Sequence, residues 1–261
     1  MSFGVLDGDG QVAQIEGHPF GQISFTGARY AQADIRLLSP ILPSKVVCVG
    51  KNYAAHIEEM KGLTGDAPSE PLLFLKPSTA VIGPGDAIRI PPGSTNVHHE
   101  VELAVVIGAR GARHVTPQQA AASIFGYTIG NDVTERDMQK GDGQWTRAKG
   151  FDSFCPIGPW IETDLGGLGL DPADLEVTCS VDGEQRQQGR TSQLIFDVPT
   201  LVSYISQVMT LLPGDVVLTG TPSGVGPIRP GQRVECTIEG LGTLTNGVAA
   251  ADAVSTAGGA R

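Results

Sequence analysis

Residues 97–107 read Val97-His98-His99-Glu100-Val101-Glu102-Leu103-Ala104-Val105-Val106-Ile107. This apolar run is typical of a β-strand, in which successive side chains point to opposite faces of the sheet. Glu100 and Glu102 then share one face, while Val101 and Leu103 point the other way into apolar surroundings. The stretch therefore predicts a strand that presents two carboxylates side by side.

Two neighbouring carboxylates repel each other unless a cation compensates them. A second cluster offers a third carboxylate, in Gly130-Asn131-Asp132-Val133-Thr134-Glu135-Arg136-Asp137. A hard divalent ion with oxygen ligands fits such a set. Two alternatives stay open. The glutamates can lie on an ordinary solvated strand face, and His98 can join two carboxylates in an iron site.

The composition limits the class of protein and its partners. The chain has 261 residues, of which 40% are hydrophobic, and a formal net charge of -10. This length is enough for one sizeable core and a small appendage. Nucleic acid and an anionic membrane surface are disfavoured as partners, because both require a basic surface. A small anionic substrate remains compatible if a metal supplies the positive charge.

The cysteines and the N-terminus bear on the compartment. The four cysteines are scattered without Cys-x-x-Cys spacing, which favours buried free thiols over a redox pair or a zinc site. Residues 1–7 have neither the basic nor the apolar part of a signal peptide, and no stretch approaches the length of a membrane span. We expect a cytoplasmic protein.

Turn signals and hydrophobic runs divide the chain into three parts. Residues 1–42 hold short alternating runs broken by Asp-Gly and predict a small N-terminal lobe with a hairpin. Residues 43–248 form the main domain, after a hinge at 39–43. Residues 249–261, made mostly of Ala, Gly, Ser and Thr, predict a disordered tail.

Within the main domain most predicted elements are strands. They are expected at residues 45–50, 72–75, 87–90, 100–108, 124–131, 175–181, 216–220 and 233–238. Helices are expected at 53–60, with Asn52 as the cap, and at 117–123 and 198–209, and a loop at 61–71. Regular strand-helix alternation is missing, so the fold class is α+β, mostly β, on a large mixed sheet.

A histidine and a glutamate three residues apart form the next candidate site. His56 and Glu59 lie on one face of the predicted helix. A carboxylate beside an imidazole fixes its tautomer and raises its basicity, which makes a general base. The alternative is a surface helical pair that contributes a few tenths of a kcal/mol.

Two further segments could bind an anion. Lys149 lies next to a glycine, and residues 220–227 follow a strand with small residues whose backbone N–H groups could hold an oxyanion. The glycine segment has no phosphate-loop ending, so nucleotide binding is disfavoured. A tight turn is the alternative interpretation.

Five blocks in order carry a resemblance to a known family: Cys48-Val49-Gly50-Lys51-Asn52-Tyr53, Phe74-Leu75-Lys76-Pro77, His99-Glu100-Val101-Glu102-Leu103-Ala104, Gly130-Asn131-Asp132-Val133-Thr134 and Leu218-Thr219-Gly220-Thr221-Pro222. They resemble the fumarylacetoacetate hydrolase family, in particular its short-chain members that act on 2-oxo acids and 2-hydroxydienoates. The resemblance runs from about residue 45 to residue 247, and residues 1–42 match only loosely.

The resemblance implies a mixed β-roll or barrel with few helices, usually as a homodimer, and a set of site residues. It implies that Mg²⁺ or Mn²⁺ is held by carboxylates matching Glu100, Glu102 and Asp132. It also implies a catalytic dyad on a mobile lid and an active-site lysine. These match His56, Glu59 and Lys149. The positions that match substrate-binding residues are Lys76, Arg136, Gln139 and Thr221.

The resemblance further implies a reaction on a small 2-oxo acid or diacid. Cleavage of the C3–C4 bond through a metal-bound enolate would decarboxylate oxaloacetate or hydrolyse an acylpyruvate. Tautomerisation of the type that isomerises 2-hydroxyhepta-2,4-diene-1,7-dioate or 5-carboxymethyl-2-hydroxymuconate is the alternative. A non-catalytic, metal-dependent module that binds a 2-oxo acid is the alternative from another class.

Overall fold

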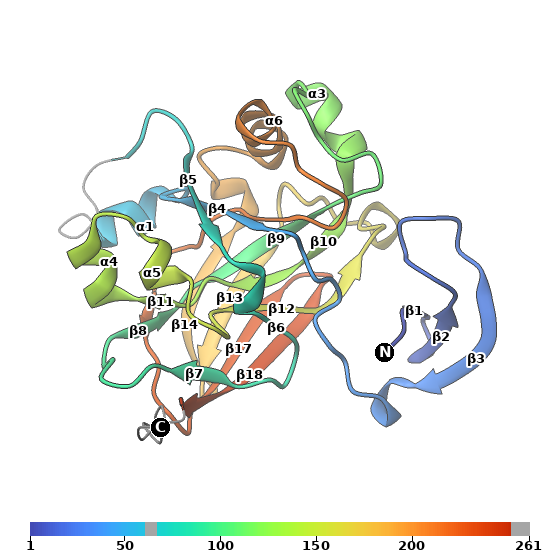
Figure 1. Ribbon diagram of the computed structural model, residues 1–261, viewed down its shortest axis with the longest axis horizontal. Coiled ribbons are helices and arrows are strands. Elements are labelled where there is room, and N and C mark those ends of the chain that lie inside the picture. Colours follow the sequence, from blue (N-terminus) through green and yellow to red (C-terminus); the bar gives the residue numbers. More distant parts are fainter. Residues whose placement is uncertain (61–66, 252–261) are drawn as a thin grey trace, which may run out of the picture.

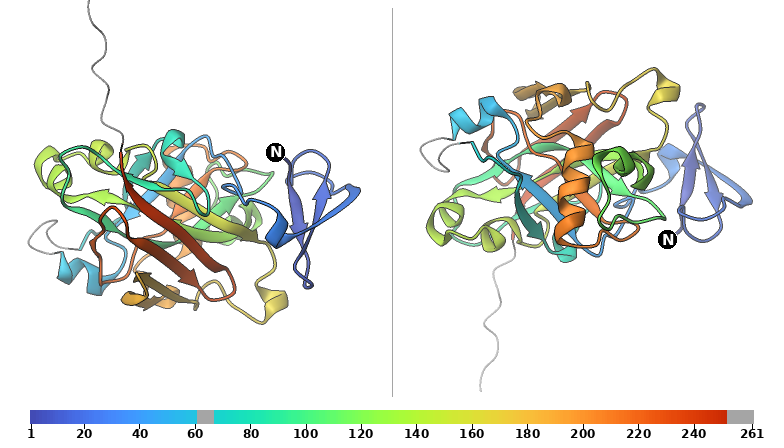
Figure 2. Two further views of the ribbon diagram at one scale, coloured as in Figure 1. Left: turned by 90° about the horizontal axis from the view of Figure 1, so that it is seen from below. Right: turned by 90° about the horizontal axis from the view of Figure 1, so that it is seen from above.

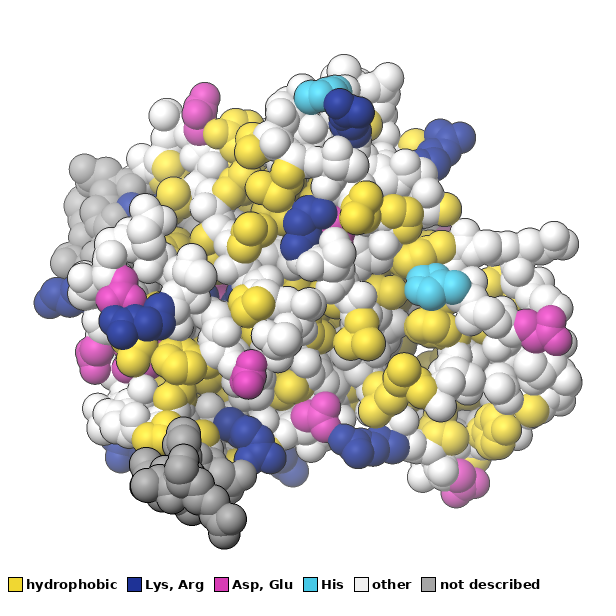
Figure 3. Space-filling view, in the orientation of Figure 1, with side chains coloured by type: hydrophobic (Ala, Val, Ile, Leu, Met, Phe, Trp, Pro, Cys, Tyr) yellow, Lys and Arg dark blue, Asp and Glu magenta, His cyan; other side chains and the backbone are white. Residues whose placement is uncertain are grey.

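The computed structural model describes residues 1–60 and 67–251. Strands dominate it, and the helices are few and short (Figure 1). The predicted fold class, α+β and mostly β, is confirmed. Within the described ranges, no helix is both long and apolar enough to cross a membrane. On the face drawn in Figure 3, the described Lys and Arg side chains are dispersed and form no continuous basic surface.

A seven-stranded mixed sheet lies at the centre of the protein, in the order β5-β4-β15-β9-β10-β12-β6. Its strands are β4 (Val46–Gly50), β5 (Leu72–Lys76), β6 (Val81–Ile82), β9 (Val101–Ile107), β10 (Ile124–Asn131), β12 (Cys155–Glu162) and β15 (Val216–Leu218). β15 is parallel to β4 and β12 to β6, whereas the other neighbours are antiparallel. The predicted mixed sheet is therefore confirmed.

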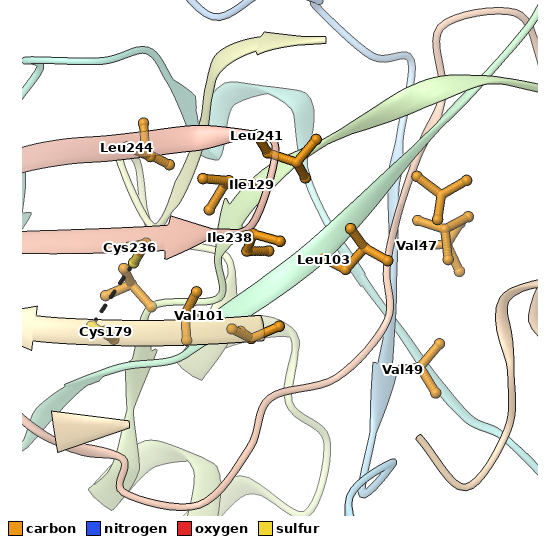
Figure 4. Close-up of a cluster of buried hydrophobic side chains, with 14 of the residues drawn as sticks. Val47, Val49, Val101, Leu103, Ile129, Cys179, Cys236, Ile238, Leu241 and Leu244 are labelled. Carbon is orange, nitrogen blue, oxygen red and sulfur yellow. Dashed lines mark hydrogen bonds between the residues drawn. The ribbon is translucent and has the colours of Figure 1, made fainter. Parts of the chain in front are cut away.

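A second sheet packs against the central one, in the order β14-β13-β17-β18-β7. Its strands are β7 (Ile88–Ile90), β13 (Glu176–Val181), β14 (Glu184–Arg190), β17 (Arg233–Ile238) and β18 (Gly242–Ala250). Figure 4 shows its Ile238 and Leu244 beside Val101, Leu103 and Ile129 of the central sheet, and these side chains belong to one buried cluster. Two apolar sheet faces packed together make the main core.

The strand that begins after Glu100 is buried along its whole length. Val101 and Leu103 point into the core between the sheets (Figure 4), whereas Ala104 and Val106 belong to a second buried cluster on the opposite face. The predicted alternation is confirmed, but both faces are covered. The alternative of a solvated strand face is therefore wrong.

Two smaller sheets complete the β-structure. One has the order β11-β8-β16, from Thr134–Glu135, Val97–His99 and Gly226–Pro227. The other is formed by β1 (Gly4–Leu6), β2 (Gln11–Ile15) and β3 (Phe25–Ala31). These three strands stand apart at one end of the molecule (Figure 2).

The described residues form a few short helices around the sheets. They are α1 (Ala54–Glu59), α3 (Pro117–Ala120), α4 (Arg136–Asp142), α5 (Thr146–Lys149) and α6 (Val198–Val208), with 3-10 turns at Gln32–Asp34, Ser78–Ala80, Ala121–Ser123, Gly166–Leu168 and Thr191–Gln193. The longest, α6, contributes Leu201, Val202 and Ile205 to the main core. The three predicted helices are present, whereas α4 and α5 were not predicted.

The predicted helix cap at Asn52 is wrong. Tyr53 is the N-cap of α1 and its side chain makes no capping hydrogen bond. The Asn52 amide instead donates to the carbonyls of Phe196 (2.9 Å) and Thr219 (2.8 Å) and accepts from Phe196 N. A buried amide satisfies the nearest backbone groups, and here these come from residues far away in the sequence.

The boundaries at the end of the chain and around the first helix also differ. β18 continues through Ala249 and Ala250, which pair with Arg89 and Ile90 of β7, so the tail prediction is wrong at these two residues. Backbone pairing, which composition does not report, orders them. Residues 252–261 of the predicted tail, and 61–66 of the predicted loop, lie outside the described residues.

The strands β12, β14 and β18 were not predicted. The four cysteines are buried and free, as predicted.

Leu218 tests the packing between the central strands. It is fully buried in β15, and a Cβ atom at Gly130 would lie 2.4 Å from its Cδ2. We expect Leu218→Ala to lower the free energy of unfolding by about 2–5 kcal/mol, because the lost contacts leave a cavity. Urea unfolding measures this. Leu42→Ala, at a position that is 69% exposed, should change it by less than about 0.5 kcal/mol; equal losses would contradict the packing.

Candidate active site

Three buried carboxylates converge where β9 and β10 meet. Glu102 pairs across the ladder with Gly130, and Asp132 follows the end of β10. The Asp132 backbone N donates to the Glu100 carbonyl at 2.8 Å, and Glu100 N donates to Asn131 Oδ1 at 2.9 Å. One oxygen of each carboxylate lies within 4.8 Å of the other two. The predicted set Glu100, Glu102 and Asp132 is thus assembled, although Glu100 lies between β8 and β9, outside either strand.

Three cations compensate two of these carboxylates directly, and one of them, Lys76 Nζ, lies 2.7 Å from Asp132 Oδ1. Lys149 Nζ lies 2.8 Å from Glu100 Oε2 and 2.5 Å from Asp132 Oδ2. The Arg136 guanidinium pairs with Glu100 Oε1. Glu102 instead accepts a hydrogen bond from the backbone N of Gly220, at 2.7 Å.

The protonation states follow from burial and from these neighbours. Burial opposes ionisation of Glu100, but Arg136 and Lys149 outweigh it and hold the pKa of this carboxyl well below its ordinary value. Burial raises the pKa of Glu102 well above its ordinary value, and the charges of Asp132 and Glu100 raise it further. Burial would lower the pKa of Lys149, yet the carboxylates raise it, so the ammonium is charged.

This set of donors fits a divalent cation. The three side chains offer hard oxygen atoms close together, and Glu102 in particular has too little positive charge nearby, as its raised pKa reflects. Oxygen ligands of this kind are those that Mg²⁺, Mn²⁺ and Ca²⁺ prefer. The triad could therefore hold a metal ion.

His56 and Glu59 form a pair on α1. His56 Nδ1 lies 3.1 Å from Glu59 Oε2, and the His56 side chain is only 11% exposed. Burial would raise the pKa of Glu59, but hydrogen bonds from His56 and from the Gly224 backbone lower it. An Nδ1–H bonded to the carboxylate leaves Nε2 as the basic nitrogen. The Glu59 side chain is 31% exposed, so the pair lies partly at the surface, as the alternative expected, while the His56 ring is buried.

The glycine segment after β15 binds carboxylates of the protein itself. Gly220 N bonds Glu102, and Gly224 N lies 3.0 and 3.2 Å from the two oxygens of Glu59. Gly224 has a φ of +99°, and a Cβ atom there would lie 2.0 Å from the Arg186 carbonyl oxygen, so only glycine fits. The predicted N–H donors are present, and in this structure two of them hold Glu102 and Glu59.

One pocket joins these groups. Its lining residues are Val49, Gly50, Lys51, His56, Ile57, Met60, Glu100, Glu102, Asp132, Arg136, Gln139, Trp145, Lys149 and Thr221. The cavity volume is about 20 Å³, room for about one water molecule.

Of the four predicted substrate-binding residues, three line the pocket and Lys76 does not. Lys76 Nζ donates to the carbonyls of Val133 (3.0 Å), Lys149 (2.6 Å) and Phe154 (2.8 Å), and it lies 2.7 Å from Asp132 Oδ1. All three ammonium hydrogens are used. In the structure Lys76 therefore connects α5 to the acidic triad, through the Lys149 carbonyl and Asp132.

Two outcomes concern residues outside the predicted set. His98 is absent from the acidic cluster found among the described residues, and its Nε2 lies 2.9 Å from Asn96 Oδ1, so the iron-site alternative is wrong. Trp145 lines the pocket and was not predicted to; its ring lies 5.3 Å from that of Phe74. Its position four residues before Lys149, on the same helical face, is the signal that could have found it.

A family model described as fumarylacetoacetate (FAA) hydrolase C-terminal matches residues 45–249. The chain belongs to the fumarylacetoacetate hydrolase family. A second model, described as Rv2993c-like, N-terminal, matches residues 1–40. The resemblance predicted from the five blocks is thereby confirmed.

Relatives with named activities are enzymes. Oxaloacetate decarboxylase, mitochondrial, of Dictyostelium discoideum is 48% identical over 76% of this chain and 90% of its own length. The X-ray structure of 5-carboxymethyl-2-hydroxymuconate delta-isomerase from Mycobacterium smegmatis is 53% identical, with a TM-score of 0.87 over 96% of this chain and 95% of that one. The chain is an enzyme of this family, and the non-catalytic binding module is disfavoured.

A third relative bears on the metal. The crystal structure of fumarylpyruvate hydrolase from Pseudomonas aeruginosa, in complex with Mn²⁺ and pyruvate, is 37% identical, with a TM-score of 0.71 over 81% of this chain and 91% of that one. A divalent metal in this family member agrees with the acidic triad.

Glu102 gives a prediction about pH. Its folded pKa lies above the ordinary value of 4.5, so the folded state binds this proton more tightly than the unfolded state. The contribution of Glu102 to the free energy of unfolding then falls as pH rises above about 4.5. In EDTA at pH 7 we expect Glu102→Gln to be more stable than the wild type by about 1 kcal/mol or more, with a difference that grows from pH 4.5 to 7.

Thermal and urea unfolding across this pH range measure the difference. Glu184→Gln, at a side chain that is 69% exposed, serves as the control and should differ little from the wild type. A Glu102→Gln protein less stable than the wild type at every pH would show that the carboxylate is already compensated.

Lys76→Met tests the tie between α5 and the triad. We expect a loss of about 3 kcal/mol or more in the free energy of unfolding, because three buried carbonyls and Asp132 lose a cation. Urea unfolding measures it, with Lys140→Met, at an exposed position of α4, as the control. A direct substrate contact, as first predicted, would instead raise KM and leave stability unchanged.

Proposed function

We propose that this enzyme uses Mg²⁺ or Mn²⁺ to cleave the C3–C4 bond of small 2-oxo acids or diacids, by oxaloacetate decarboxylation or acylpyruvate hydrolysis. One observation carries the proposal: three buried carboxylates share a pocket with a charged lysine and a histidine-carboxylate pair. The relative named oxaloacetate decarboxylase supports the choice of substrate.

The proposed metal ligands are Glu100, Glu102 and Asp132. A divalent ion held there would act as a Lewis acid that polarises the carboxylate and keto oxygens of a 2-oxo acid. The hydrogen bonds from Gly220 N to Glu102 and from the Glu100 backbone N to Asn131 Oδ1 would keep the ligands oriented.

Arg136 and Gln139 are proposed to orient the substrate carboxylate. Arg136 Nη1 donates to Gln139 Oε1 at 2.8 Å, which fixes the plane of the guanidinium. Its buried Nε has no hydrogen-bond partner among the described residues. A buried unpaired donor beside a pocket is a position where a ligand oxygen would be bound.

Lys149 is proposed to stabilise charge as the bond breaks. The electron pair of the C3–C4 bond moves onto the 2-oxo group and gives the enolate of pyruvate, while C4 leaves as CO₂ or, after attack by water, as a carboxylic acid. A charged ammonium in a buried site stabilises the developing oxygen charge. C3 of the enolate then takes up a proton.

His56 is proposed as the general base, oriented by Glu59. Its Nε2 would take a proton from the water that attacks a C4 carbonyl, as acylpyruvate hydrolysis requires. Decarboxylation of oxaloacetate needs no such water. The two reactions should therefore respond differently to loss of His56.

Isomerisation is the second candidate. It requires only that a proton move between carbons of a bound dienolate, and the same His56–Glu59 pair could carry that proton. The 53% identical relative named as an isomerase favours it.

A homodimer belongs to the proposal as well, since β5 is an edge strand of the central sheet and exposes Leu72 and Leu75.

Pyruvate release from oxaloacetate and from acetylpyruvate, with Mg²⁺, Mn²⁺ or EDTA, tests the proposal. Spontaneous and metal-catalysed decay without protein is subtracted. We expect turnover that needs metal, and His56→Ala should lower acetylpyruvate hydrolysis by about 10²–10⁴-fold while affecting oxaloacetate decarboxylation much less. His114→Ala, at an exposed histidine, is the matched control. Failure to release pyruvate from either substrate would reject C–C cleavage and leave isomerisation as the candidate.

A further inference from the structure

A fully buried glutamine reaches the acidic triad from the second sheet. Gln187 lies on β14, its exposure is 0%, and none of the predicted motifs includes it. It is separated from Val101 by 86 residues of sequence. Its amide nevertheless contacts the backbone between Glu100 and Glu102.

The Gln187 amide makes four hydrogen bonds. Oε1 accepts from Val101 N at 3.1 Å and from His99 Nδ1 at 2.9 Å. Nε2 donates to Thr221 Oγ1 at 2.7 Å and to the Pro222 carbonyl at 2.8 Å. The orientation of the amide is settled by chemistry, because Val101 N–H can only donate and the Pro222 carbonyl can only accept.

Three of these groups close a ring around Val101. Thr221 accepts from Gln187 and donates its own hydroxyl proton to the Val101 carbonyl, at 2.8 Å. Val101 N–H in turn donates to Gln187. Both the N–H and the C=O of the one residue that separates Glu100 from Glu102 are thus held by side chains.

The ring lies where the sheet stops supplying partners. β9 and β15 pair as far as Ala104 and Leu218, and the chain then turns into the glycine segment beside the pocket. Backbone groups of Val101 that are buried there still need hydrogen bonds. The side chains of Gln187 and Thr221 supply these hydrogen bonds, so no further strand has to pair with Val101 beside the pocket.

We propose that Gln187 is a positioning residue that acts through Val101 and Thr221 to set the spacing of the Glu100 and Glu102 carboxylates for a divalent metal. The inference rests on the proposed function, since it concerns the metal ligands of that site. His99, held by the same amide, precedes Glu100 directly and adds a second restraint on its backbone.

The test measures Mn²⁺ affinity by calorimetry on protein stripped with EDTA, which needs no substrate. Gln187→Met keeps the length of the side chain and removes all four hydrogen bonds. We expect it to weaken the Kd for Mn²⁺ by about tenfold or more. Amide hydrogen exchange of a peptide that contains Val101 should become faster in the same variant.

Asn246→Leu is the matched control. Asn246 is a buried amide on β18 whose Nδ2 donates to the carbonyls of Gly83 and Asp86. Its loss should lower thermal stability and leave the Kd for Mn²⁺ within about twofold of the wild type. This separates the loss of a buried amide in general from the loss of this ring.

Thr221→Val is the second variant, in case Gln187→Met does not fold. It opens the ring at its other member, so it should also weaken Mn²⁺ binding. The double variant, with Gln187→Met and Thr221→Val, should bind Mn²⁺ about as weakly as the weaker-binding single variant, because either substitution alone breaks the ring.

The outcomes separate the two proposals. A folded Gln187→Met protein, or a folded Thr221→Val protein, that binds Mn²⁺ as the wild type does would overturn the positioning role and leave the proposed function standing. Effects that multiply in the double variant would overturn the ring. A wild-type protein that does not bind Mn²⁺ would overturn the metal site of the proposed function and the inference with it.

Discussion

The mutual repulsion of three buried carboxylates is the constraint on which the rest of the structure depends. Glu100, Glu102 and Asp132 bring oxygens within 4.8 Å of one another, at a place where burial alone opposes every one of their charges. Lys149, Lys76 and Arg136 compensate two of them. Glu102 is left with one backbone hydrogen bond and a raised pKa. Such a site is costly for the folded protein unless a cation completes it.

The scaffold meets this cost with hydrogen bonds that come from outside the triad. Lys76 donates hydrogen bonds to three backbone carbonyls and pairs with Asp132. Gln187 and Thr221 bind the backbone of Val101, which lies between the two glutamates. The glycine segment after β15 adds N–H groups that bind Glu102 and Glu59. Hydrogen bonds from these surrounding residues thus help to hold three carboxylates close together in a buried site.

The same arrangement explains how one pocket could serve several related reactions. In the proposed function, the charged lysine beside the triad would stabilise an oxygen anion and the His56–Glu59 pair would move a proton. Hydrolysis requires that the base take a proton from water, isomerisation that it move a proton between carbons, and decarboxylation neither of these. Solved structures of family members named as an isomerase and as a hydrolase share the fold of this chain, so the fold by itself does not specify the reaction.

Local spacing in the sequence determined the groups that carry the chemistry. A period of two places Glu100 and Glu102 on one face, a spacing of three pairs His56 with Glu59, and the ordered blocks indicate the family; these features depend only on neighbouring residues. Tertiary structure alone decided that both faces of β9 are buried, that Asn52 bonds a distant loop instead of capping α1, that Lys76 ties α5 to the triad, and that Gln187 reaches Val101. The physical reason is that segments tens to more than a hundred residues away determine which side chains are buried and which hydrogen-bond partners they meet. The residues adjacent in sequence do not indicate which distant segments these are.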